Sequence, residues 1–229
     1  MRTIGLLGGM SWESSIEYER LINSEVRRRL GGVASADLII RSYNFAEIEA
    51  LQEADSWDEA GERLAGDAAR LEAAGAEMIV LCTNTMHRVA STIEDAIDVP
   101  LLHIADPTAA AIHGEGLSTV GLLGTRYTME QDFYSERLAS SGITCVIPDE
   151  PDRTTVHDVI FDELVRGIIA PASRDAYARI VGSLVDRGAE GLIAGCTEIE
   201  LLIGAGDIPV PLFPTTHLHA MAAVDAAMA

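Results

Sequence analysis

The chain has 229 residues, of which 48% are hydrophobic, and a formal net charge of −20. This length and apolar content are sufficient for a buried core in one large domain or two small ones. The negative charge argues against binding to nucleic acid or to an anionic membrane. The apolar runs are much shorter than the roughly 20 residues of a membrane-spanning helix, and no signal-peptide pattern opens the chain, so a soluble cytoplasmic protein is expected.

The basic residues exclude two classes of enzyme. All 16 of them are arginines, and the sequence contains no lysine. Enzymes that use pyridoxal phosphate hold it through a lysine Schiff base, and P-loop sites need the lysine of their motif. We therefore expect no cofactor of either kind. The three cysteines are odd in number and lie in apolar runs, which indicates free thiols in a reducing compartment rather than a disulfide framework.

Apolar runs alternate with segments of helical periodicity along the chain. Strands are predicted at residues 3–7, 37–41, 77–82, 99–104, 119–123, 144–147, 191–194 and 210–213. Helices are predicted at residues 13–30, 57–73, 85–97, 128–140, 155–167, 174–186 and 216–228. The strands are continuously apolar, which is typical of parallel sheets that helices cover on both faces. The sequence therefore predicts an α/β fold.

The two halves of the chain resemble each other. The motifs IGLLGG and VGLLGT place Gly5 and Gly121 near the start of the halves, and apolar runs lead to Cys82 and Cys196. The spacing from glycine to cysteine is 77 positions in the first half and 75 in the second. We therefore predict two lobes related by a pseudo-two-fold axis, each with a mainly parallel sheet. The predicted N-terminal lobe comprises residues 1–99 and 210–229, and the C-terminal lobe residues 100–209.

Cys82 and Cys196 each follow a predicted strand and precede residues that favour helix starts. Open α/β sheets bind ligands at the carboxyl ends of their strands. A helix start is expected to lower the thiol pKa from its usual value of about 8.5. Two thiols on opposite sides of one carbon would remove a proton from one face and return it to the other. Cys145, in the apolar run ITCVIP, is interpreted as a core residue.

Metal and dinucleotide sites are less well supported. His87 follows Cys82 by five positions, and His217 and His219 form an H-x-H pair. Because no C-x-x-C or H-E-x-x-H motif is present, we predict no metal site and interpret His87 as packing or capping its helix. The segment GGMS lacks the G-x-G-x-x-G pattern, and its glycines are expected to allow close approach of a small ligand to the backbone.

Four segments together resemble the aspartate/glutamate racemase family, and most closely its broad-specificity amino-acid racemase branch. They are IGLLGGMSWESS, LCTNTMH, LLGTRYTMEQDFY and GCTEIELL, and they extend over nearly the whole chain. The resemblance implies two α/β lobes with an active site between them, catalysis without pyridoxal phosphate, and frequent homodimers. It also implies that Cys82 and Cys196 act in turn as base and acid on a small amino-acid substrate.

The same resemblance implies a set of substrate-binding residues. They are Met10, Ser11, Gln52, Thr83, Asn84, Thr85, Thr125, Thr128, Arg166, Thr197 and Glu198. Arg166 matches a position where aspartate-specific members carry a basic residue. Glu198 is either a carboxylate that stabilises a helix start or a contact of the substrate amine. Strict aspartate racemases carry an arginine in the loop after the second strand, whereas this chain reads RSYNFAEIEALQ there, so a strict preference for acidic side chains is not implied.

The expected function is therefore racemisation of aspartate, glutamate or a broader set of amino acids. Two other classes remain open. A maleate isomerase or an arylmalonate decarboxylase would need only one cysteine, and the isomerase would form a covalent adduct with its substrate. A non-catalytic amino-acid-binding protein would bind its ligand without exchanging the α-proton for solvent deuterium.

Overall fold

The computed structural model describes residues 1–229 and divides into two compact units. Unit 1 comprises Met1–Ile104 and His219–Ala229, and unit 2 comprises Ala105–Leu218. The predicted lobe boundaries, at 99/100 and 209/210, differ from this division. The reason is that strand Leu101–Leu102 pairs with the first sheet, whereas strand Leu212–Pro214 pairs with the second.

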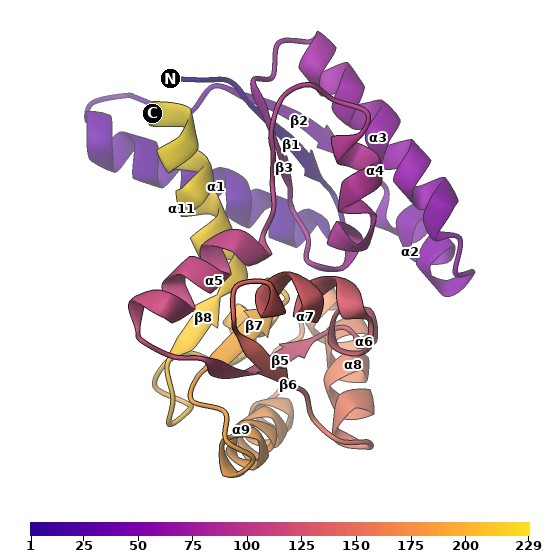
Figure 1. The fold of residues 1–229 in the computed structure, drawn as a ribbon, viewed down its shortest axis with the longest axis vertical. Helices are drawn as coiled ribbons and strands as arrows, with labels where there is room; N and C mark the ends of the chain where they lie inside the picture. The colour runs from indigo at the N-terminus through magenta and orange to yellow at the C-terminus, as the bar shows by residue number, and fades with distance from the viewer. The chain divides into compact units, whose positions relative to one another are not determined.

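Unit 1 contains a parallel sheet with the strand order β2-β1-β3-β4. Its strands are β1 (Ile4–Gly8), β2 (Leu38–Ser42), β3 (Met78–Leu81) and β4 (Leu101–Leu102). Its helices are α1 (Trp12–Leu30), α2 (Phe45–Glu53), α3 (Trp57–Ala73), the 3-10 helix η1 (Thr85–Val89), α4 (Ala90–Glu94) and most of α11 (Thr215–Met228). As predicted, α11 joins the first half of the chain: it packs with α1 on one face of the sheet, while α3 covers the other (Figure 1).

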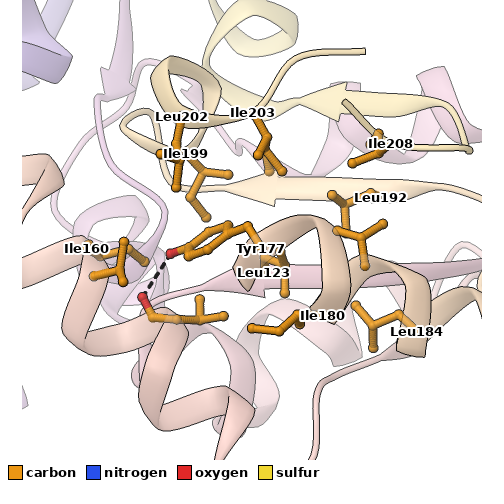
Figure 2. Close-up of a cluster of buried hydrophobic side chains, with 14 of the residues drawn as sticks. Leu123, Ile160, Tyr177, Ile180, Leu184, Leu192, Ile199, Leu202, Ile203 and Ile208 are labelled. Carbon is orange, nitrogen blue, oxygen red and sulfur yellow. Dashed lines mark hydrogen bonds between the residues drawn. The ribbon is translucent and has the colours of Figure 1, made fainter. Parts of the chain in front are cut away.

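Unit 2 repeats this plan with the strand order β6-β5-β7-β8. Its strands are β5 (Thr119–Gly124), β6 (Thr144–Val146), β7 (Leu192–Gly195) and β8 (Leu212–Pro214). Its helices are α5 (Ala105–Gly114), α6 (Arg126–Glu130), α7 (Asp132–Ala139), α8 (Asp152–Asp162), the 3-10 helix η2 (Leu164–Arg166), α9 (Pro171–Asp186) and α10 (Ile199–Leu202). In its core, the buried Tyr177 donates a hydrogen bond of 2.9 Å to the carbonyl of Val156 and is surrounded by isoleucine and leucine side chains (Figure 2).

The predicted internal repeat is reproduced in the packing of two glycines. A Cβ atom on Gly5 would lie 2.8 Å from Ile79 Cδ1 and 3.3 Å from Leu71 Cβ in α3. A Cβ atom on Gly121 would lie 2.9 Å from Leu184 Cδ1 in α9. In both units the missing side chain therefore allows a helix to lie close to the central strand.

All eight predicted strands are present, but the helices differ in detail. Helix α5, which contains Pro107, was not among the predicted helices. Proline is tolerated in the first turn of a helix, where its missing N–H has no intrahelical acceptor. The edge strands are only partly buried because each has one neighbouring strand, and Cys145 in β6 is accordingly half-buried rather than a full core residue. No helix combines the length and apolar character needed to cross a membrane.

Candidate active site

The predicted site residues fall at the carboxyl ends of corresponding strands. Cys82 directly follows β3, and Cys196 directly follows β7. Each of these strands pairs with the first strand of its own sheet, β1 or β5. Met10 and Ser11 follow the end of β1, and Thr125 follows the end of β5. Each unit therefore brings one cysteine to the same sheet edge as predicted substrate-binding residues.

Cys82 lies in a fully buried position in unit 1. Its backbone N–H continues the sheet by donating to the carbonyl of Leu7 at 2.9 Å, and its thiol contacts the carbonyl of Val80 at 3.7 Å. Burial raises the pKa of the Cys82 thiol. Asn84 and Thr85, which follow it, are also buried. The thiol is therefore neutral at pH 7 in the ligand-free protein.

Three further predicted residues of unit 1 lie near this loop or at the same sheet edge. Ser11 is the N-cap of α1 and accepts a hydrogen bond from the backbone N–H of Ser14 at 3.4 Å. Gln52, which is buried on α2, donates to Met86 Sδ at 3.1 Å. Since Met86 belongs to η1, the helix that follows Cys82, Gln52 connects α2 to the cysteine loop. Met10 is buried beside Ser11.

Cys196 is half-buried, and its thiol donates a hydrogen bond to Glu198 Oε2 at 2.9 Å. Burial, and then the negative charge of Glu198, raise the pKa of the Cys196 thiol. The Glu198 side chain is itself buried. Neither role expected for Glu198 included this contact, and the structure makes the carboxylate a partner of the thiol.

Hydroxyl groups hold the remainder of the Cys196 loop. The Thr197 and Thr216 hydroxyls form a hydrogen bond of 2.6 Å, and Thr215 donates to the carbonyl of Ala194 at 2.8 Å. Thr215 and Thr216 were not predicted. The signal that identifies them is their position directly after β8, which pairs with β7 and so ends at the same sheet edge.

The other predicted residues of unit 2 are Thr125, Thr128 and Arg166. Thr125 is the N-cap of α6 and accepts a hydrogen bond from the backbone N–H of Thr128 at 3.3 Å, and both residues are buried. Arg166 belongs to η2, which packs against α10, the helix after Cys196. Its side chain is exposed, and its ion pair with Asp162 is long, at 3.8 Å. The structure therefore places Arg166 near the Cys196 loop without contacting it.

One expectation about local chemistry, that helix starts lower the thiol pKa values, is wrong. The pKa values of both thiols are raised, because burial outweighs the helix starts: η1 has five residues and α10 has four. In the GGMS segment, Gly9 lies so close to the backbone of Tyr43 that an added Cβ atom would overlap it. Gly9 also has φ of +84°, a conformation that favours glycine.

The histidines noted in the sequence do not form a metal-ligand set. His217 is exposed, whereas His219 is fully buried, so the two do not share a site. His87 bonds to the carbonyl of Thr83 through Nδ1 at 2.8 Å. No group of three or more histidine, cysteine, aspartate or glutamate side chains is placed to hold a metal ion.

Comparison with known proteins assigns the chain to a family. A family profile described as Asp/Glu/Hydantoin racemase matches residues 7–223. A candidate Asp/Glu racemase from Yersinia pestis is 52% identical, with 100% of both chains covered and a TM-score of 0.94. An aspartate racemase homologue from Pyrococcus horikoshii is 33% identical, again with 100% of both chains covered, at a TM-score of 0.87. The broad specificity amino-acid racemase RacX of Bacillus subtilis is 23% identical over 75% of this chain and 74% of its own length. The chain therefore belongs to the Asp/Glu/Hydantoin racemase family, and the general activity that these similarities support is racemisation.

Proposed function

We propose that this chain is a cofactor-independent amino-acid racemase in which Cys82 and Cys196 exchange protons with the α-carbon of the substrate. The observation that carries the proposal is the matched position of the two thiols. Each directly follows the strand that neighbours the first strand of its sheet, and the two sheets have the same strand order. A two-base racemisation uses two such groups, one for each face of the carbon.

The proposed reaction consists of two proton transfers. One cysteine, as thiolate, removes the α-proton: the Cα–H bond breaks, an S–H bond forms, and the electron pair stays on the planar carbanion beside the carboxylate. The other cysteine, as thiol, delivers its proton to the opposite face, so the two roles are exchanged when the product leaves. Hydroxyl and backbone N–H groups at Ser11, Thr83, Thr125 and Thr197 are the proposed donors that stabilise the negative charge of the carbanion.

Because the pKa values of both thiols are raised, substrate binding must lower one of them before a thiolate can form. An amino acid brings a positive ammonium group, and a positive charge near a thiol lowers its pKa. In addition, Cys196 already donates its hydrogen bond to Glu198, so the proton has an acceptor when the thiolate forms. We propose that Glu198 is the base that activates Cys196. Cys82 carries no such carboxylate, because the residue two positions after it is Asn84.

Arginine pairing supports a substrate range that is not limited to acidic side chains. Arg41 pairs with Asp67 at 3.1 Å, and Arg63 pairs with Glu47. Both guanidinium groups also stack on the ring of Tyr43, which follows β2. The positive charges beside this loop are therefore already matched by carboxylates of the protein. The name of the Bacillus subtilis relative points in the same direction.

Arg166 is the proposed contact for a substrate carboxylate, because a long, exposed ion pair holds its guanidinium only weakly. We also propose a cytoplasmic location and a homodimer. All three cysteines are free thiols, which fits the reducing environment of the cytoplasm.

The proposal is tested by incubating the protein with a panel of L-amino acids in deuterated water. The wild-type protein is expected to replace the α-proton by deuterium and to form the D-enantiomer. Cys82→Ser and Cys196→Ser should each lower the rate of racemisation by at least about 1,000-fold, because general acid–base groups contribute factors of this size. Cys145→Ser, in edge strand β6, is the matched control and should retain the wild-type rate.

Three results would contradict the proposal. Full racemisation by either the Cys82 or the Cys196 variant would remove the two-cysteine mechanism. A stable covalent adduct between substrate and one cysteine would favour the isomerase class. Calorimetric binding of an amino acid without deuterium incorporation would indicate a binding protein.

A further inference from the structure

Three buried histidines meet beside the Cys82 loop and have no role in the proposed reaction. The ring centroids of His87 and His103 are 4.5 Å apart, and those of His87 and His219 are 5.8 Å apart. All three residues belong to unit 1 and are less than one-tenth exposed. They come from η1, the segment after β4, and α11.

The hydrogen bonds of His87 define its tautomer. Nδ1 lies 2.8 Å from the carbonyl oxygen of Thr83, which can only accept, so Nδ1 carries the proton. Nε2 accepts the backbone N–H of Ile104 at 3.1 Å and is therefore unprotonated. The neutral ring thus connects two backbone segments, the residue directly after Cys82 and the end of the β4 segment.

His219 adds a second fixed contact to the same segment. Its Nε2 lies 2.8 Å from the carbonyl of Leu102 and must donate to it, so Nδ1 accepts the hydroxyl proton of Tyr18 at 2.8 Å. Leu102 and Ile104, two residues apart, are therefore held by His219 and His87 respectively. Tyr18 and its helix α1 are fixed by the surrounding core.

These bonds persist only while the histidines are neutral. A proton on His87 Nε2 would face the N–H of Ile104, placing two donors against each other. Burial lowers the pKa of His219 to about 3, so this ring stays neutral at physiological pH. Neither ring is available as a metal ligand, because both nitrogens of His87 and of His219 already bond to protein groups.

We infer that neutral His87 is a positioning residue that fixes the backbone of Thr83, and through it the Cys82 thiol, relative to the end of β4. This inference rests on the proposed function, because it assigns His87 to the Cys82 half of the reaction. Since Cys82 directly precedes Thr83, rotation of the Thr83 carbonyl would move the thiol. His87 acts through Cys82 and does not touch the substrate.

The test compares His87→Leu with His87→Gln. Leucine removes both hydrogen bonds, whereas glutamine has a donor and an acceptor that can replace them. We expect His87→Leu to lower kcat by at least about tenfold with little change in KM, and His87→Gln to recover part of the loss. His113→Leu is the matched control, because His113 bonds to the carbonyl of Ser141 at an exposed position of unit 2 and should leave kcat unchanged.

The enantiomer that loses α-proton exchange distinguishes a displaced Cys82 from a general loss of folded protein. With Cys82 displaced, the enantiomer that Cys196 deprotonates should still exchange its α-proton with D₂O, yet racemise slowly. The other enantiomer should lose both exchange and racemisation. An equal loss of α-proton exchange for both enantiomers, in proportion to the unfolded fraction, would overturn the inference. Wild-type kinetics in His87→Leu would also overturn it.

A second measurement does not depend on turnover. In wild-type protein between pH 7 and 8, the ¹⁵N NMR shifts of His87 should show the Nδ1–H tautomer that its two hydrogen bonds define. An Nε2–H tautomer, or a charged ring in this range, would overturn the inference even if racemisation is present. Conversely, a wild-type protein that shows the expected tautomer but exchanges no α-proton would contradict the proposed function, and with it the assignment of His87 to catalysis.

Discussion

The two cysteine loops share a backbone plan but differ in the groups that support them. The Cys82 loop is held by a neutral histidine and contains no carboxylate, whereas Cys196 donates directly to Glu198. Threonine hydroxyls take the place of histidine in the second loop, where Thr197 bonds to Thr216. The repeat therefore conserves the position of the thiol at the end of a strand, while the chemistry around each thiol has diverged.

The sheet register shows a further difference. Gly5 pairs with Ile79, so Cys82 lies three positions further along, whereas Gly121 pairs with Leu192, and Cys196 lies four positions further along. Successive residues of a strand point to opposite faces. This one-residue difference therefore changes the direction in which the thiol projects from the end of its strand. This is consistent with one thiol contacting the carbonyl of a preceding residue and the other a side chain ahead of it.

Among substitutions of residues that surround the thiols, the largest effect is expected at the positions two residues after each cysteine. Glu198→Gln removes a charge that raises the pKa of Cys196, so this thiol pKa should fall. Loss of the proposed base should also lower kcat by about 100-fold, the lower end of what general acid–base groups contribute. The reciprocal variant, Asn84→Asp, adds a carboxylate near Cys82 and should raise the pKa of that thiol.

The measurement is the pH dependence of kcat/KM for both enantiomers. The Glu198→Gln profile should shift to lower pH and the Asn84→Asp profile to higher pH. If Glu198→Gln keeps the wild-type rate and profile, the carboxylate is not a base for Cys196, and the two loops are chemically more alike than their hydrogen bonds indicate.

Acid pH should lower the stability of the folded protein through the buried His219. The pKa of His219 falls from 6.5 in the unfolded chain to about 3 in the folded protein, because burial, with the nearby His87, disfavours the charge. Between pH 6.5 and pH 5 the unfolded chain takes up a proton that the folded protein does not bind. This difference should lower the free energy of unfolding by about 2 kcal/mol.

Urea unfolding at pH 7.5, 6.5 and 5 measures this loss. The control is His219→Gln, which keeps a donor for Leu102 and an acceptor for Tyr18 but cannot take up a proton. Its unfolding free energy should fall less steeply with acidification, and the difference between the two proteins isolates the histidine from the many titrating carboxylates. An identical slope in both proteins would show that His219 is protonated alike in the folded and unfolded states.

The last prediction compares the two packing glycines, which are expected to differ by only about 1 to 2 kcal/mol. An alanine at position 5 would place Cβ 2.9 Å from Ala76 Cβ, a rigid neighbour, in addition to its contact with Ile79. At Gly121 the atoms nearest to the new Cβ are Leu184 Cδ1 and Leu192 Cδ1, which are ends of flexible side chains. We expect Gly5→Ala to lower the unfolding free energy by about 2 to 3 kcal/mol and Gly121→Ala by about 1 kcal/mol. Thermal unfolding checks the order, and a larger loss at Gly121 would reverse it.

Much of the fold follows from periodicity and repetition. The eight strands, the parallel pairing and the repeat around Gly5 and Gly121 are all expressed in short apolar runs, because buried strands need continuous apolar sequence. Helix α5 was not predicted because a proline usually ends a helix. Pro107 is compatible with α5 only because it lies in the first turn.

Less of the candidate site was predictable. The positions of the two cysteines follow from local sequence, but the groups around them depend on residues far away in the chain. His219 reaches Leu102 of β4, and Thr216 reaches the Cys196 loop, only because β8 and α11 return to the sheets. No local sequence pattern predicts that return. The raised thiol pKa values likewise depend on burial by the whole fold, which outweighs the short helices after each cysteine.

The division of the chain between the units has a consequence for the order of folding during synthesis. Unit 2 is one continuous segment, Ala105–Leu218, and all its parts are present once that segment has left the ribosome. Unit 1 is discontinuous: Met1–Ile104 emerges first but lacks the part of α11 that covers one face of its sheet. The backbone N–H of Arg2 also donates to the carbonyl of Ala227, at 2.8 Å. The half of the protein that is made first is therefore completed last, and until then the apolar surface under α11 is open to chaperones or to misfolding.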